Sequence, residues 1–173
     1  MIDGDQLPTL AAPRVVLRWL TEADAGALYA IFSDPKVMRY WSTPPMSDIA
    51  QAEKLVADTH EDFRAKRAFP WGVARLEDDR IIGTCTLFAI NEAQGRAEVG
   101  YALGHEYWGR GYMNEALTAL VDFAFGTLAL RRLEADVDPC NAGSLHAVER
   151  LGFRREGLLR ERWKVNGELQ DSV

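Results

Sequence analysis

Apolar residues recur with two different periods along the 173-residue chain, and the alternation of these periods predicts a mixed fold of strands and helices. Residues 14–19 predict a first strand. Thr21-Glu22-Ala23-Asp24 is a capping-box pattern that begins a helix, and this helix is expected to end at Asp34-Pro35. Ser47 is the expected cap of a second helix, which runs to about Arg64 with one apolar face.

The middle of the chain predicts an antiparallel meander. Strands are expected at 69–76, 81–90 and 97–103, because apolar runs there are separated by turn residues. An amphipathic helix with its apolar residues in register over 117–128 follows. The short apolar run at 133–137 then predicts a buried strand, and the strand–helix–strand order implies a parallel pairing.

The end of the chain predicts one more helix and a hairpin. Leu145, Val148 and Leu151 mark the helix, and Gly152 follows it as a C′ residue. Two strands, expected over 154–165 and 168–173, flank the two-residue turn Asn166-Gly167.

Composition narrows the class of protein. The chain is 47% hydrophobic and 27% charged, which is typical of globular proteins. Its net charge of −6 argues against a nucleic-acid partner. The same charge weakly fits a positively charged acceptor, although plain solubility is the favoured explanation.

Further signals concern location and metals. Cys85 and Cys140 form no C-x-x-C pair, which predicts a reduced, cytoplasmic protein. No signal peptide and no membrane partner are expected, because the N-terminus lacks an apolar segment and the most apolar helix is short and interrupted. The three histidines lack metal-ligand spacing, so no metal is expected.

Candidate chemistry is concentrated in the segment YWGRGYMNEA, residues 107–116. Gly109 and Gly111 let the backbone approach a ligand where a strand gives way to a helix. The first turn of a helix leaves about four N–H groups unpaired and favours negative charge. The segment therefore predicts a phosphate-binding loop, with a plain tight turn as the alternative. It is not a Walker loop, because no Lys-Ser or Lys-Thr pair occurs, and Asn114 stands where a dinucleotide fingerprint has its third glycine.

With this loop, the chain resembles the GNAT superfamily of acyl-CoA N-acyltransferases, and within it the ribosomal-protein N-terminal alanine/serine acetyltransferases. The pyrophosphate motif Gln/Arg-x-x-Gly-x-Gly/Ala falls on Trp108-Gly109-Arg110-Gly111-Tyr112-Met113, with Trp108 replacing the basic residue and Met113 the last small one. Other segments that resemble this branch are 14–18, 34–41, 98–101, 138–144, 151–153 and 166–171. Relatives usually continue through a full final strand beyond the position of Val173, which leaves open whether the last strand is complete.

The resemblance implies a fold and an activity. The fold is α/β (α+β), a single domain over 1–173 with its core at about 14–173, in which about four helices flank a central mixed, mostly antiparallel, splayed sheet. The activity is transfer of an acetyl group from acetyl-CoA, without a metal, directly to a primary amine. A protein or peptide N-terminal α-amine is the first choice of acceptor. A small-molecule amine such as an aminoglycoside, polyamine or amino-acid derivative is the alternative, and a non-catalytic acyl-CoA-binding module is the alternative of another class. Oligomeric state and acyl-chain preference are left open, and a homodimer is compatible with the sequence.

Aminolysis of a thioester requires a base, donors for the oxyanion and a proton source for the leaving thiolate. The resemblance implies that Glu98 is the base, acting through water, although glutamate on a strand is more often a solvated surface residue. It places Ser144 near the thioester sulfur, as proton donor and as a cofactor contact. Asn141 is expected to contact the pantetheine arm, and it also fits a plain N-cap.

The remaining cofactor contacts are also implied by the resemblance. Backbone groups along Gly100, Tyr101, Ala102 and Leu103 are expected to pair with the pantetheine arm as an added strand would. The loop contacts expected for the cofactor are Trp108, Gly109, Arg110, Gly111, Tyr112, Met113 and Asn114. Apart from the resemblance, Tyr40, Trp41, Trp71 and Trp163 are candidates to line an acceptor groove, although large aromatic residues are more often part of a core. Tyr40 and Trp41 are favoured because they lie in a Pro-flanked loop.

Overall fold

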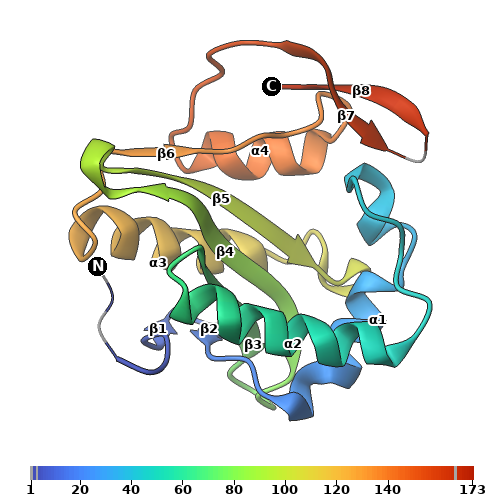
Figure 1. Ribbon diagram of the computed structural model, residues 1–173, viewed down its shortest axis with the longest axis vertical. Helices are drawn as coiled ribbons and strands as arrows, with labels where there is room; N and C mark the ends of the chain where they lie inside the picture. The colour runs from blue at the N-terminus through green and yellow to red at the C-terminus, as the bar shows by residue number, and fades with distance from the viewer. Residues whose placement is uncertain (1, 3, 166) are drawn as a thin grey trace.

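The computed structural model describes residues 2, 4–165 and 167–173 of the chain. In this described part, the larger sheet has six strands that lie in chain order (Figure 1). They are β1 (Leu10–Ala11), β2 (Val15–Arg18), β3 (Ala68–Arg75), β4 (Ile81–Asn91), β5 (Arg96–Leu103) and β6 (Arg132–Glu134). Every neighbouring pair is antiparallel except β5 and β6, which are parallel. The predicted mixed, mostly antiparallel sheet is therefore confirmed.

Helices cover both faces of this sheet (Figure 1). Helices α1 (Ala25–Phe32) and α2 (Ile49–Arg64) pack on one face, and α3 (Tyr112–Gly126) packs on the other. Helix α4 (Ala142–Arg150) follows β6 and lies beside a separate hairpin of β7 (Leu159–Val165) and β8 (Glu168–Ser172). Short 3-10 helices complete the described elements: η1 (Glu22–Asp24), η2 (Val37–Tyr40), η3 (Glu92–Gln94) and η4 (His105–Tyr107). Within the described residues, no helix combines the length and apolarity that a membrane span requires.

The core has two parts, one on each face of the sheet. Neighbouring residues of β3 belong to different parts, because successive side chains of a strand point to opposite faces. Val73 packs in the cluster under α3, whereas Ala74 packs in the cluster under α1 and α2. The interior of β3 is buried on both faces of the sheet, and its sequence is therefore an almost continuous apolar run.

Both predicted N-terminal caps can be compared with the structure. The capping box of Thr21 and Asp24 is confirmed, although the first turn that it caps is 3-10 in geometry. For α2 the prediction is wrong by one residue, since the cap is Asp48 and not Ser47. The Asp48 carboxylate accepts from the Ala50 amide at 2.9 Å, and the Gln51 side chain accepts from the Ser47 amide at 2.7 Å.

The clearest differences from the predicted strands concern the ends of the sheet. The apolar pattern did not predict β1. Strand β6 is shorter than the expected 133–137, because the backbone of Val137 exchanges two hydrogen bonds with Val173, at 3.0 and 2.8 Å, beyond the end of the β5–β6 pairing. The final hairpin begins at Leu159 and not near residue 154. Asn166 of its predicted turn lies outside the described residues.

Candidate active site

The loop between β5 and α3 has the backbone that its two glycines predict. Gly109 and Gly111 have φ values of 71° and 84°, a region that residues with a side chain rarely adopt. The Trp108 indole donates to the Leu103 carbonyl at 2.7 Å, so this side chain ties the loop to the end of β5. The loop thus turns sharply out of the strand and into the helix.

The start of α3 presents unpaired donors. Gly111 occupies the N-cap position and supplies no side-chain acceptor. Among the described residues, none accepts a hydrogen bond from the amides of residues 109–114, whereas the Glu115 amide donates to the Gly111 carbonyl at 3.1 Å. The positive end of the helix dipole lies at the same place. This geometry suits a phosphate group without any metal ion.

Strands β5 and β6 separate beyond a short pairing. Their ladder runs from Arg96 opposite Arg132 to Glu98 opposite Glu134 and ends there. The rest of β5, up to Leu103, stays paired with β4 on its other side. One edge of β5 is therefore free of β6 over 99–103, where an extended ligand can pair with the backbone.

A contact between β5 and α4 crosses the opening between these strands. The Tyr101 hydroxyl lies 2.5 Å from Ser144 Oγ and 3.1 Å from the Ser144 carbonyl oxygen. Burial raises the pKa of Tyr101, although the bond to Ser144 acts in the opposite direction, so the phenol stays protonated at neutral pH. Asn141 is the N-cap of α4, and its side chain accepts from the Ser144 amide at 3.1 Å. The structure brings Asn141, Tyr101 and Ser144 together, and sequence reasoning missed the tyrosine–serine bond because its partners are far apart in sequence.

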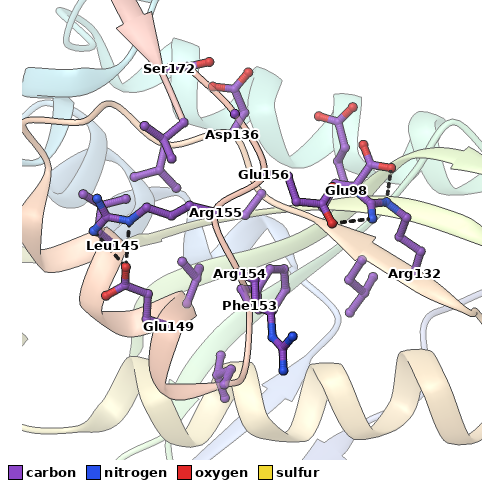
Figure 2. Close-up of a pocket in the computed structure, with 18 of the residues that line it drawn as sticks. Glu98, Arg132, Asp136, Leu145, Glu149, Phe153, Arg154, Arg155, Glu156 and Ser172 are labelled. Carbon is purple, nitrogen blue, oxygen red and sulfur yellow. Dashed lines mark hydrogen bonds and ion pairs between the residues drawn. The ribbon is translucent and has the colours of Figure 1, made fainter. Parts of the chain in front are cut away.

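Glu98 lines an open cavity of about 550 Å³, most of whose other lining residues come from β6, α4, the segment after α4 and the final hairpin (Figure 2). Its carboxylate has no hydrogen-bond partner among the described residues, and its side chain is half-buried. The neighbouring carboxylate, Glu134, accepts from Arg132 at 2.9 Å and from Arg96 at 3.2 Å. The bond from Arg132, reinforced by Arg96, holds the pKa of Glu134 below its usual range despite opposing desolvation. Of these two carboxylates, Glu98 is the one without an ion-pair partner in the described structure.

The predicted groove aromatics fall into two groups. The Tyr40 hydroxyl donates to the Cys140 carbonyl at 3.0 Å, next to the start of α4, and the adjacent Trp41 is partly exposed. The Trp163 indole donates to Asp136 at 3.1 Å, in the segment between β6 and α4. Trp71 is the exception. Its side chain is 0% exposed in the core under α3, and its indole donates to the Pro8 carbonyl at 2.8 Å. The prediction that Trp71 lines a groove is corrected, because the apolar core holds this side chain away from the surface.

Met113 and Ala102 also have buried side chains, at 8% and 5% exposure, so any contact they make with a cofactor is through the backbone. Within the described residues, no group of three or more His, Cys, Asp or Glu side chains is placed to hold a metal ion.

The chain matches one protein family and is similar to several known proteins. The family model of the acetyltransferase (GNAT) domain matches residues 14–154. The uncharacterized N-acetyltransferase p20 of Bacillus licheniformis is 37% identical over 165 residues, which cover 95% of this chain and 93% of that protein. Spermidine N(1)-acetyltransferase of Escherichia coli (strain K12) is 29% identical, covering 94% of this chain and 85% of that one. The ribosomal protein uS5-alanine N-acetyltransferase of the same strain is 26% identical, with coverage of 95% and 87%.

Solved structures share the fold. The acetyltransferase (GNAT family) from Bacillus anthracis superposes with a TM-score of 0.85 at 22% identity, covering 95% of both chains. RimJ of Mycobacterium smegmatis, solved in complex with CoA-disulfide, gives a TM-score of 0.85 at 25% identity and covers 97% of this chain and 84% of that one.

Proposed function

Because the chain belongs to the GNAT acetyltransferase family, and is thus an acyl-CoA-dependent N-acetyltransferase, we propose that its acceptor is the α-amine of a protein or peptide N-terminus. The observation that carries the proposed site is the set of unpaired amides of residues 109–114 at the positive end of α3. The diphosphate of CoA binds these donors, and the pantetheine arm lies along the free edge of β5. This path leads the thioester towards the space between β5 and the start of α4.

Glu98 acts as the base in this proposal. The attacking amine must lose a proton, and an α-amine with a reference pKa of about 8 needs only a weak base acting through water. The carboxylate of Glu98 is half-buried, faces a cavity and has no ion-pair partner among the described residues. A glutamate engaged by arginines, such as Glu134, is a poorer base because its negative charge is already neutralised.

Ser144 relays a proton to the leaving thiolate, giving its own hydroxyl proton to the sulfur and taking another from solvent. The amine nitrogen forms a bond to the acetyl carbon, the carbon–sulfur bond breaks, and the sulfur takes a proton. When the Tyr101 hydroxyl donates to Ser144 Oγ, the serine hydrogen is free to point towards the sulfur. Burial keeps Tyr101 in its neutral, donating form at neutral pH.

A polyamine is the second candidate acceptor, and one observation favours it. The relative of E. coli named for spermidine is 29% identical to this chain, compared with 26% for the one named for ribosomal protein uS5. Both reactions use the same fold, so the choice depends on groove residues around Tyr40, Trp41 and Trp163. The free thiols of Cys85 and Cys140 support a reducing, cytoplasmic location for either reaction.

A CoA-release assay tests the proposal. Purified protein is given acetyl-CoA and a panel of peptides with varied first residues, spermidine and other small amines. Peptides are expected to release CoA fastest, and faster release with spermidine would instead establish the polyamine reaction. Binding of acetyl-CoA without release by any amine would establish a non-catalytic binding module.

Two matched variants test the base. Glu98→Gln is expected to lower kcat by about 10²–10⁴ with little change in the KM for acetyl-CoA. Glu92→Gln, an exposed carboxylate in the turn before β5, is the control and is expected to leave kcat unchanged. Near-normal turnover of Glu98→Gln at neutral pH would remove Glu98 from the mechanism.

A further inference from the structure

Arg14 lies immediately before β2 and holds both α3 and the loop that precedes it. Its Nε donates to Glu115 Oε1 at 2.7 Å, and its backbone N–H donates to Glu115 Oε2 at 2.9 Å. Its Nη2 donates to the Arg110 carbonyl at 2.8 Å, between the two glycines of the loop. We propose that Arg14, which also neutralises Glu115, is a positioning residue that presets the loop for the diphosphate of CoA. This inference rests on the proposed binding of CoA by residues 109–114.

The bond to the Arg110 carbonyl determines where the next amide points. A trans peptide unit is planar, and its carbonyl and N–H point in opposite directions. Because Arg14 holds the Arg110 carbonyl on its own side, the N–H of Gly111 points away from Arg14. That N–H is one of the amides without a partner among the described residues. Arg14 therefore aims a donor outward without itself contacting the ligand.

The same side chain neutralises a charge that would oppose the ligand. Glu115 lies in the first turn of α3, close to the unpaired amides, and its side chain is only 17% exposed. A carboxylate that is poorly solvated repels a nearby phosphate more strongly than one in bulk water. Arg14 pairs with it through Nη2 and Oε1 at 2.5 Å. The amide donors consequently act on the ligand without an uncompensated negative charge beside them.

Packing keeps Arg14 in this position. Its guanidinium lies 4.7 Å from the centroid of the Tyr112 ring, a cation–π contact. A Cβ at Gly111 would lie 3.1 Å from Arg14 Nη2, so the space that a side chain would need there is already filled. Glycine at position 111 thus permits the positive φ and also leaves room for the Arg14 side chain.

The test compares ligands with and without the diphosphate. Affinities of CoA, 3′-dephospho-CoA and pantetheine are measured by titration calorimetry or by competition with acetyl-CoA. Arg14→Ala is expected to weaken both diphosphate ligands by about tenfold or more, since charge-assisted hydrogen bonds are lost and Glu115 is left unpaired. Pantetheine, which lacks phosphate, is expected to change by less than about twofold, and kcat at saturating acetyl-CoA is expected to stay near that of the wild type.

Further variants separate positioning from simple structural support. Glu115→Gln is expected to bind CoA at least as tightly as the wild type, and adding it to Arg14→Ala is expected to recover part of the lost affinity. Arg14→Lys, which keeps the charge without the two-pronged geometry, is expected to be intermediate. Arg67→Ala is the control, because this arginine pairs with Glu61 and Asp62 at the end of α2.

The possible results distinguish a positioning role of Arg14 from a purely structural one. Equal losses for pantetheine and CoA in Arg14→Ala, or a Glu115→Gln variant as weak as Arg14→Ala, would overturn the positioning role. An unaffected Arg14→Ala would do the same while leaving the proposed function intact. If Arg14→Ala does not fold, Arg14→Lys and Glu115→Gln still give the comparison. A wild-type protein that binds no CoA would overturn the proposed function, and the role of Arg14 would fall with it.

Discussion

Alanine at Gly109 is the sharpest test of the loop. Gly109 has a φ of 71°, and a Cβ built there would meet no atom within 4 Å. The substitution therefore adds backbone strain without a clash inside the protein. A left-handed conformation costs a residue with a side chain about 1–2 kcal/mol, partly offset by the lower entropy of the unfolded chain.

Gly152 offers a matched control. It follows α4 with a φ of 90°, and a Cβ there would also meet nothing within 4 Å. Both alanine variants are expected to lose about 1 kcal/mol of unfolding free energy, which for a chain of this size lowers Tm by about 2–4 °C. Only the Gly109 methyl stands beside the unpaired amides of residues 109–114.

Calorimetric titration with CoA distinguishes the two sites. Gly109→Ala is expected to raise the Kd for CoA by about tenfold or more, because the methyl keeps the diphosphate from the backbone and the strain shifts the amides. Gly152→Ala is expected to bind CoA as the wild type does. Wild-type affinity in Gly109→Ala, or equal weakening in both variants, would refute binding of the diphosphate by this backbone.

Three further results are expected. Burial disfavours the charge of Asp24, but hydrogen bonds from Arg18 and Thr21 outweigh this effect and lower the pKa of Asp24. The carboxylate should therefore stabilise the fold above its unfolded pKa of about 4, and the urea midpoint of unfolding should fall as the pH drops below that value. The fall should be smaller in Asp24→Asn. Burial raises the pKa of the Cys85 thiol, so a thiol reagent should label Cys140 in the native protein and Cys85 only after unfolding; rapid native labelling of Cys85 would contradict its burial. Tyr101→Phe should cost about 1–2 kcal/mol of stability and lower kcat about tenfold, whereas an unchanged kcat would exclude the tyrosine from proton transfer.

Much of the fold could be predicted because its signals are local. The apolar runs of β3, β4 and β5, the capping box at Thr21 and the glycine that follows α4 each depend on a few neighbouring residues. The cap of α2 was misplaced by one residue, since Ser47 and Asp48 are both good caps and the backbone chooses between them. The strand β1, with only two residues, is too short for a periodic pattern.

The tryptophans show that local sequence does not predict whether a large aromatic side chain is buried. Trp41, Trp71 and Trp163 were all predicted to line a groove, yet Trp71 is fully buried while the other two are partly exposed. An indole suits a core and a groove equally well by composition. Whether an indole is buried depends on the helices and strands that pack against it, and the neighbouring residues in the sequence do not determine that packing.

The sequence by itself determined the glycine loop, the amphipathic helix after it and the order of strands β2 to β6 along the chain, because backbone conformation and hydrophobic period are properties of neighbouring residues. Tertiary structure alone decided that Arg14 reaches Glu115 and that Tyr101 reaches Ser144, at sequence separations of 101 and 43 residues. Such contacts depend on how strands and helices pack, and the sequence around either residue does not predict its partner. The physical reason is that a hydrogen bond acts over about 3 Å of space, whatever the length of chain between its two ends.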